Sequence, residues 1–471
     1  MHLAYDIISK KRGEIILKNE EVKLDIVDYG NNFEGIAKQD GKVVFVPYAM
    51  NEEKIIGKVI KENKNYSIVK INEIVKESRF RVTPFCEVYK RCGGCSAQHI
   101  EYLEQLRIKR KNVENLLKNY NVNYNLLENT IGQGLPYYYR NKVQYPVRVD
   151  KEGKAKIGFY SKRSHEIVEN NCCFIQNRVI DMLAKEIFNI LIQNNFSGYK
   201  EEEGTGDIRH ILIRHGYHTG EIMVVLVVNR KEIFSKEIFV KVAEKIISIN
   251  KNIKSVFLDL NESKTNEILG EEVLNIYGED YITDYIGEYK YLISPKSFFQ
   301  VNTIQAEMLY ETLKEKLELN GDEILFDLYS GVGSIGIFLS KDVKRIYGIE
   351  IEKSAVEMAN INLKENNVKN AEYIAGAVED KIEEFKIRNI IPDVIVVDPP
   401  RKGLDEKSIE YLLNFNAKKI GYVSCNPSTM VRDLKLLESK YDTITITPVD
   451  MFPHTSSVEC VSVLQRKKIE K

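Results

Sequence analysis

The first part of the chain alternates apolar and polar residues over short stretches. Residues 21–28 alternate, residues 43–46 form a β-rich run, and residues 54–71 supply two more strands. Asp40-Gly41 has the composition of a hairpin turn. Five short strands within residues 14–75 predict a small OB-like β-barrel, a fold often used on oligonucleotides, although a β domain without a ligand gives the same pattern.

Helical spacing takes over at residues 100–120, and mixed patterns continue to residue 290. The apolar stripe of this helix consists of Ile100, Leu103, Leu106, Val113, Leu116 and Leu117. The basic run Arg107-Ile108-Lys109-Arg110-Lys111 lies opposite that stripe. Strands at 220–228 and 255–260, with helices at 179–193 and 234–249, predict an α+β central domain.

From about residue 291 strands and helices alternate regularly. Strands are predicted at 323–328, 345–349, 394–397 and 420–424, and helices at 354–365 and 428–439. This alternation predicts an α/β domain with a doubly wound parallel sheet, whose ligands bind at the carboxyl ends of the strands.

Length and composition fit several folded units. The chain has 471 residues, of which 43% are hydrophobic, enough for real cores. It contains no apolar run long enough to span a membrane, and Met1-His2-Leu3-Ala4-Tyr5-Asp6 lacks the apolar core of a signal peptide. We therefore expect a cytoplasmic protein that does not bind membranes.

Basic residues are concentrated in one part of the chain. The net charge is −1, but residues 76–180 hold 19 Lys and Arg against 10 Asp and Glu. Aromatic residues such as Tyr137, Tyr138 and Phe159 lie in the same stretch. This combination is typical of a surface for a nucleic-acid backbone and unstacked bases, although a solvated charged surface is the plain alternative.

A glycine-rich turn leaves the first predicted strand of the C-terminal domain. It reads Phe326-Asp327-Leu328-Tyr329-Ser330-Gly331-Val332-Gly333-Ser334-Ile335-Gly336. Glu350 ends the next strand, where a carboxylate accepts hydrogen bonds from ribose hydroxyls. The glycine spacing also fits a nicotinamide dehydrogenase, but Asp327 before the turn favours a methyltransferase, whose cofactor has no pyrophosphate to bind.

The turn Asp398-Pro399-Pro400-Arg401 follows the apolar strand at 394–397, at the edge of the sheet where ligands bind. Enzymes that methylate amino groups carry an acidic-Pro-Pro turn followed by an aromatic residue that stacks on the base. Arg401 occupies that position here, which argues against nitrogen methylation.

Cys425 and Glu459 provide the groups that methylation of a uracil carbon requires. Carbon 5 becomes nucleophilic only after a thiolate adds to carbon 6, and a base must then remove the carbon-5 proton. Cys425 follows a strand and precedes a helix in Ser424-Cys425-Asn426-Pro427, where the helix dipole favours a thiolate. Cys460 lies in an alternating run typical of a core cysteine, and His454 is either a competing base or a turn cap.

Five motifs in order resemble those of the RumA/TrmA family of RNA (uracil-5-)-methyltransferases, most closely its 23S ribosomal RNA branch. The motifs are Ser297-Phe298-Phe299-Gln300-Val301-Asn302, the Gly331 turn, Asp398-Pro399-Pro400-Arg401, Ser424-Cys425-Asn426-Pro427, and Met451-Phe452-Pro453-His454-Thr455 with Glu459. The resemblance covers nearly the whole chain.

This resemblance implies a Rossmann-like class I methyltransferase domain that uses S-adenosylmethionine to methylate 23S ribosomal RNA, as a monomer that does not bind DNA. Transfer RNA is the alternative substrate. The family pattern implies Cys425 as the nucleophile and Glu459 as the proton acceptor. The implied cofactor contacts are Gln300, Tyr329, Glu350 and Asp398. Phe298-Phe299 has two interpretations, core packing or stacking on a uracil that has left its stack.

The resemblance also divides the chain into domains. Residues 14–75 resemble a TRAM domain, an RNA-binding module whose turns match Gly30, Gly35 and Gly41. Residues 76–97 and 130–290 form the central domain, and 98–129 form a helical segment that packs on the catalytic domain at 291–471. An RNA-binding protein with an inert catalytic half is the alternative, which the complete set of catalytic residue types disfavours.

Cys86, Cys92 and Cys95 have the spacing C-x5-C-x2-C, with Gly93-Gly94 inside it. Zinc sites usually show two C-x2-C pairs, so this spacing fits an iron–sulfur cluster better, with Cys172-Cys173 as candidates for the fourth thiolate. The family pattern implies a [4Fe-4S] cluster in the central domain. It selects Cys173, because the triplet Phe174-Ile175-Gln176 follows it. An iron–sulfur oxidoreductase would leave Cys425 and Glu459 without a role.

Overall fold

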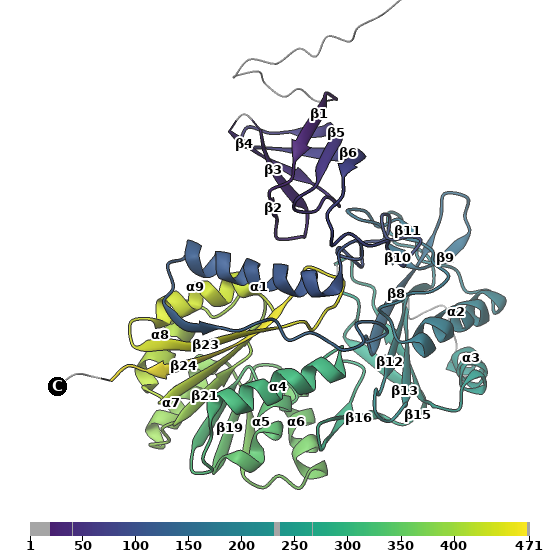
Figure 1. The fold of residues 1–471 in the computed structure, drawn as a ribbon. Coiled ribbons are helices and arrows are strands. Elements are labelled where there is room, and N and C mark those ends of the chain that lie inside the picture. Colours follow the sequence, from purple (N-terminus) through teal and green to yellow (C-terminus); the bar gives the residue numbers. More distant parts are fainter. Residues whose placement is uncertain (1–18, 40, 230–235, 266, 469–471) are drawn as a thin grey trace, which may run out of the picture. The chain divides into compact units, whose positions relative to one another are not determined.

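The chain forms two units, and the computed structural model describes residues 19–39, 41–229, 236–265 and 267–468 (Figure 1). One unit comprises Met1–Phe85, Cys95–Ile108 and His454–Ser456, and the other comprises Cys86–Gly94, Lys109–Pro453 and Ser457–Lys471. Residues 14–18 of the predicted barrel, Asp40 of the predicted hairpin turn, residues 234–235 of a predicted helix and the N-terminal segment lie outside the described residues.

Strands dominate the described part of the first unit. They form one sheet of order β1-β5-β6-β4-β3-β2. Their bounds are β1 Glu21–Asp25, β2 Asp28–Tyr29, β3 Gly35–Gln39, β4 Lys42–Val46, β5 Lys54–Glu62 and β6 Tyr66–Lys76. Alternate residues such as Val22, Leu24 and Val44 face a common core, as the sequence pattern predicted. Five strands were expected, and the additional one is the two-residue β2, which pairs with β3 after a turn at Gly30.

Helix α1 spans Tyr102–Asn119, close to its predicted bounds. Lys109 belongs to the basic run that the sequence places opposite the apolar stripe, but its side chain is fully buried. Its Nζ donates to Asp450 Oδ1 and, at 3.2 Å, to the Phe452 carbonyl. Removing one partner of such a buried pair typically costs about 3–5 kcal/mol, so this pair fixes the segment that leads to Glu459.

The central part of the second unit is an α+β layer, as predicted. Its sheet has the order β15-β14-β13-β12-β8-β9. The strands are β8 Lys142–Val149, β9 Ala155–Ile157, β12 Ile208–His215, β13 Ile222–Val228, β14 Ile253–Leu260 and β15 Glu272–Gly278. Helices α2 (Arg178–Gln193) and α3 (Lys236–Ile249) pack on one face of this sheet. Two short hairpins accompany it, β10 Phe159–Tyr160 with β11 Ile167–Val168, and β16 Ile282–Ile286 with β17 Tyr289–Ile293.

The C-terminal part of the same unit holds a larger sheet, of order β20-β19-β18-β21-β22-β24-β23-β7. Its strands are β7 Tyr124–Leu127, β18 Ile324–Leu328, β19 Arg345–Glu350, β20 Ala371–Ala375, β21 Val394–Val397, β22 Lys419–Ser424, β23 Tyr441–Val449 and β24 Glu459–Arg466. The first five strands in that order are parallel, as predicted. The prediction of a wholly parallel sheet was wrong, because β24 runs antiparallel to both β22 and β23. The segment between β23 and β24 contains no helix and is too short for the crossover that a parallel pair of strands needs, so the two strands are antiparallel.

Helices cover both faces of the larger sheet (Figure 1). They are α4 Thr303–Leu317, α5 Ser334–Phe338, the short η1 Ser340–Asp342, α6 Lys353–Glu365, α7 Val378–Ile387, α8 Glu406–Phe415 and α9 Pro427–Leu437. The apolar residues of α4, α5 and α6 share one core, and those of α7, α8 and α9 share the other. Val113 and Leu117 of α1 join the second core. None of the helices in the described ranges combines the length and the apolar composition that crossing a bilayer requires.

Candidate active site

The glycine turn between β18 and α5 is held by the buried carboxylate of Asp327. The N–H of Gly336 donates to Asp327 Oδ2 at 3.0 Å, and Tyr373 Oη donates to the same oxygen at 3.4 Å. Burial raises the pKa of Asp327 to about 7. A β-carbon on Gly336 would lie 2.3 Å from Tyr373 Oη, so this position requires glycine.

Gly331, by contrast, has open space beside it. Its φ is 54°, in the left-handed region that favours glycine, and an added β-carbon would meet no described atom within 4 Å. Glu350 Oε2 accepts the Gly331 N–H at 2.9 Å, and Tyr329 Oη forms a 2.8 Å hydrogen bond with Ser408 Oγ. Two of the predicted cofactor contacts, Glu350 and Tyr329, therefore lie at the same accessible turn.

Strand register brings Cys425 and Glu459 together. In the antiparallel pair of β22 and β24, Ser424 lies opposite Cys460. Cys425 directly follows Ser424 and Glu459 directly precedes Cys460, so one further step of this register would bring Cys425 and Glu459 to the same edge of the sheet. The Glu459 charge acts on the Cys425 thiol, which agrees with this placement. The predicted nucleophile and the predicted base therefore lie within electrostatic range of each other.

Asp398 adds a second carboxyl group at this edge of the sheet. It follows β21, the strand next to β22. Burial raises the pKa of Asp398 to about 7, and burial together with the Asp398 charge raises the pKa of Glu459 to about 8. Burial, Glu459 and Asp398 raise the pKa of the Cys425 thiol, whereas Arg401 lowers it. Such a site disfavours further negative charge and favours a cationic ligand beside the carboxyl groups.

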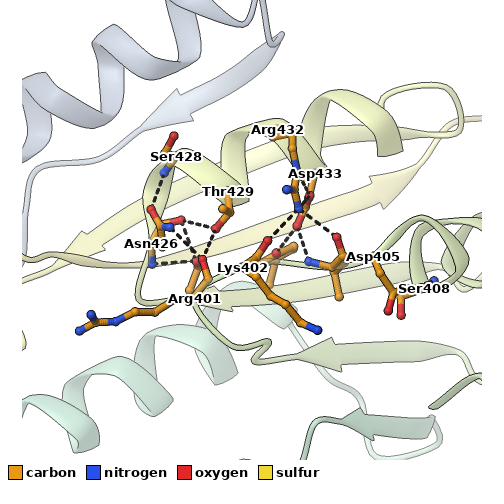
Figure 2. A network of polar contacts seen from close by, with 12 residues as sticks. Arg401, Lys402, Asp405, Ser408, Asn426, Ser428, Thr429, Arg432 and Asp433 are labelled. Atoms are coloured by element: carbon orange, nitrogen blue, oxygen red, sulfur yellow. Dashed lines mark hydrogen bonds and ion pairs between the residues drawn. The ribbon is translucent and has the colours of Figure 1, made fainter. Parts of the chain in front are cut away.

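Polar residues at the start of α9 hold the turn that carries Asp398 and Arg401 (Figure 2). Asn426 Nδ2 donates to the Arg401 carbonyl at 2.8 Å, and Thr429 Oγ1 donates to the same oxygen at 3.3 Å. Figure 2 shows the Arg401 side chain extending away from these bonds. Two of the sequence motifs are thus joined by direct hydrogen bonds, which fixes Asp398 relative to Cys425.

Asp433 anchors the other end of this turn and was not singled out in the sequence. Its buried Oδ2 accepts the Leu404 N–H at 2.8 Å and the Tyr422 hydroxyl at 2.6 Å. Arg432 Nη2 donates to the carbonyls of Lys402 at 3.1 Å and Leu404 at 2.9 Å (Figure 2). An acidic residue on the apolar stripe of a helix was the signal that could have revealed Asp433.

The segment before α4 carries Gln300 and the two phenylalanines. Gln300 is buried, and its carbonyl accepts the Asn141 Nδ2 at 2.9 Å. Phe299 is buried in the core and contacts Tyr291, whereas the side chain of Phe298 is 66% exposed. Core packing therefore accounts for Phe299 alone, and Phe298 presents its ring to solvent, where a base can stack.

The cysteine loop begins the second unit. The N–H of Cys92 donates to the Val88 carbonyl at 2.8 Å, and the N–H of Gly94 donates to Cys92 Sγ at 3.4 Å. Burial raises the pKa of Cys86, and the nearby thiols of Cys92 and Cys172 add to this rise. Thiols from the loop and from the Cys172-Cys173 segment thus lie within electrostatic range of each other.

Among the residues that the structure describes, no group of three or more His, Cys, Asp or Glu side chains is placed to hold a metal ion. Cys95 belongs to the first unit. The N–H of Cys173 donates to Asp181 Oδ2 at 3.4 Å.

His454 lies in the first unit and takes part in a turn. Its Nδ1 is 3.2 Å from Gln105 Nε2, and its N–H donates to Gln105 Oε1 at 3.1 Å. Its carbonyl accepts the N–H groups of Ser96 and Ala97, both at 3.0 Å. These bonds match the turn-capping interpretation of His454.

Comparison with known proteins identifies the family of this chain. The sequence profile of the family described as tRNA (Uracil-5-)-methyltransferase matches residues 101–467, most of the chain. The chain belongs to this uracil-5-methyltransferase family. This membership confirms, at the level of the family, the resemblance that the five motifs indicated. It also confirms the predicted α/β methyltransferase fold.

Relatives of this family resemble the chain over nearly their whole length. An RNA methyltransferase of Clostridium acetobutylicum, described as uncharacterized, is 43% identical over 456 residues, covering 96% of this chain and 98% of the relative. Another uncharacterized RNA methyltransferase, from Staphylococcus epidermidis, is 40% identical, and the match covers 97% of this chain and 100% of the relative. The tRNA (uracil-54, C5)-methyltransferase of Pyrococcus abyssi, solved in complex with S-adenosyl-L-homocysteine, is 27% identical, with a TM-score of 0.74, covering 94% of this chain and 100% of that one.

Proposed function

We propose that this protein transfers a methyl group from S-adenosylmethionine to carbon 5 of a specific uracil in 23S ribosomal RNA. The observation that carries the proposal is that Cys425, Glu459 and Asp398 lie within electrostatic range of one another at one edge of the sheet. A nicotinamide dehydrogenase or a nitrogen methyltransferase would have no use for this thiol and carboxyl pair. We infer that the protein works as a monomer in the cytoplasm and binds neither DNA nor membranes.

The cofactor would bind along the carboxyl ends of β18, β19 and β21. Glu350 would accept the ribose hydroxyls, and Tyr329 and Gln300 would contact the rest of the molecule. Asp398 would lie near the sulfonium, whose positive charge would offset the charges of Asp398 and the buried Glu459. The open backbone at Gly331 and the S-adenosyl-L-homocysteine bound to the Pyrococcus abyssi enzyme support this arrangement.

In the proposed reaction, the Cys425 thiolate adds to carbon 6 of the uracil and the electrons of the double bond move onto carbon 5 and the carbonyl. Carbon 5 then attacks the methyl group, and S-adenosyl-L-homocysteine leaves with the sulfonium electron pair. Glu459 accepts the carbon-5 proton, the double bond re-forms, and the thiolate is released. Arg401, held by Asn426 and Thr429, favours the thiolate electrostatically.

The substrate assignment has one competitor. The matched family and the Pyrococcus abyssi structure are named for transfer RNA, so a tRNA uracil is the second candidate. The strand-rich N-terminal domain and the cysteine motif favour ribosomal RNA by resemblance. We assign residues 14–75 as a TRAM domain that binds RNA, 76–97 and 130–290 as the central domain, 98–129 as a segment that packs on the catalytic domain, and 291–471 as that domain.

Mapping 5-methyluridine by mass spectrometry in cells with and without this protein tests the assignment. We expect one 23S rRNA position to lose the modification in the deletion strain and to regain it when the wild-type protein is restored. Restoration with Cys425→Ala is the matched control and should leave the position unmodified. Loss of the modification in tRNA alone would contradict the ribosomal assignment and favour the second candidate.

We further infer that Cys86, Cys92, Cys95 and Cys173 hold a [4Fe-4S] cluster. The sequence spacing supports the inference, and Cys92 and Cys172 lie within electrostatic range of Cys86. Uracil methylation moves no electrons, so the cluster would stabilise the central domain for RNA docking.

Anaerobic purification should give an iron-sulfur absorption band and bound iron and sulfide. Cys173→Ser should lose them and Cys172→Ser should keep them, and the reverse would transfer the ligand role to Cys172. If oxidising or reducing the intact cluster switched methyl transfer on and off while RNA affinity stayed the same, a purely structural role of the cluster would be contradicted.

A further inference from the structure

Cationic side chains gather at one end of the central sheet, beside the segment that carries Phe298. Lys142 opens β8 and lies directly opposite Arg214 of β12 in the antiparallel register. Arg140 lies two positions before Lys142. Burial lowers the pKa of Lys142 to about 7, and the charges of Arg214 and Arg140 add to this effect. Like charges on opposed strand residues are unfavourable, so the free protein keeps this cluster at an energetic cost.

Several donors in this cluster lack acceptors. The Nε atoms of Arg140 and Arg214 are buried without a hydrogen-bond partner. Across the described residues, neither Lys142 Nζ nor the Arg140 guanidinium forms a hydrogen bond or ion pair. Buried donors in native proteins are nearly always satisfied, so acceptor atoms from outside the chain would complete the bonding of the two buried Nε atoms.

Arg214 links the cluster to the segment before α4. Its Nη2 donates to the carbonyls of Pro295 at 3.1 Å and Ser297 at 2.5 Å. The next residue along the chain, Phe298, is 66% exposed. Cationic groups beside an exposed aromatic ring are the combination that binds single-stranded nucleic acid, with phosphates on the cations and a base on the ring.

We propose that Arg140, Lys142 and Arg214 form a binding site for a phosphodiester group of the RNA strand that presents the uracil. This inference rests on the proposed function, because it takes RNA as the substrate. A phosphate supplies acceptor oxygens for the unsatisfied guanidinium and ammonium donors, and its charge relieves the repulsion among the three cations. The cofactor's carboxylate is the other anion of the reaction, but its own ammonium group makes it a weaker match.

Affinity for a short, fluorescein-labelled, single-stranded RNA that contains uridine tests the site. Lys142→Met and Arg140→Gln should each bind this RNA roughly ten- to a hundredfold more weakly, the range for one charge-assisted hydrogen bond. The plot of log affinity against log salt should become shallower by about 0.7 for each phosphate that the variant no longer neutralises. Affinity for S-adenosylmethionine should not change, and the KM for RNA should rise with little change in kcat.

Lys156→Met is the matched control, because Lys156 is a half-buried lysine of the same sheet that Asp150 and Glu169 already neutralise. It should leave RNA affinity and salt slope unchanged, and Lys142→Arg should retain most of the affinity. Unchanged RNA binding by Lys142→Met would overturn the site while leaving the methyltransferase function intact. A loss of cofactor affinity instead of RNA affinity would also overturn it.

A second measurement covers the case in which the variants fail to fold. Methylphosphonate linkages remove the charge of one phosphate at a time, and one linkage near the uridine should weaken binding to the wild-type protein. Binding that tolerates every neutral linkage overturns the proposal. Failure of the wild-type protein to methylate any RNA would instead refute the proposed function.

Discussion

Cys425→Ala is expected to lower methyl transfer to uridine by several orders of magnitude, since loss of a covalent nucleophile has cost other enzymes roughly 10⁶-fold. Without the thiolate, carbon 6 has no nucleophile to accept, and carbon 5 never gains the electron density needed to attack the methyl group. Transfer of tritium from labelled S-adenosylmethionine to RNA measures the loss. Cofactor affinity, measured by calorimetry, should stay within a few-fold of wild type, because the glycine turn and Glu350 are untouched.

Cys460→Ala is the matched control for this variant. Cys460 lies in β24 opposite Ser424 and is buried in the core, one residue from Glu459. A substitution there removes a sulfur atom from the same strand pair without removing the proposed nucleophile, so activity should remain near wild type. Methylation by Cys425→Ala at the wild-type rate would exclude covalent activation of the uracil and would favour a nitrogen target.

Much of this site could be predicted because its residues end strands of a parallel sheet. Glu350, Asp398 and Cys425 each follow an apolar strand in the sequence, and parallel strands place their carboxyl ends at one edge. The same rule fails for Glu459, which begins its strand. Its position depends on β24 running antiparallel to β22, and that direction follows from the helix-free link after β23.

Features that depend on distant partners could not be predicted from local patterns. Lys109 has the spacing of a solvent-facing residue, and its burial is tolerable because it pairs with Asp450 and the Phe452 carbonyl, far along the chain. Asp433 gives a local signal, because it is an acidic residue on the apolar stripe of a helix, but that signal does not identify Leu404 and Tyr422 as its donors. The adjacent Phe298 and Phe299 differ in exposure because one ring meets Tyr291 and the other points outward, a difference that composition cannot show.

Glu459→Gln is expected to trap the RNA on the protein as a covalent adduct. The amide cannot accept the carbon-5 proton, so addition of Cys425 and methyl transfer can occur but the double bond cannot re-form and the thiolate cannot leave. The adduct should be seen as a band of increased mass on a denaturing gel, and mass spectrometry should find the methyl group on the bound uridine. Glu350→Gln is the matched control, since the same chemical change at a proposed ribose contact should weaken cofactor binding without accumulating adduct.

The pH dependence separates a base from a residue that only shapes the site. Burial and the Asp398 charge raise the pKa of Glu459 to about 8, and only its ionised form can take up the proton. Release of RNA by the wild-type protein should therefore slow as the pH falls below about 8, and adduct should accumulate at low pH as it does in Glu459→Gln at any pH. If the adduct lifetime in wild-type protein did not change with pH while Glu459→Gln still turned over, another group would have to accept the proton.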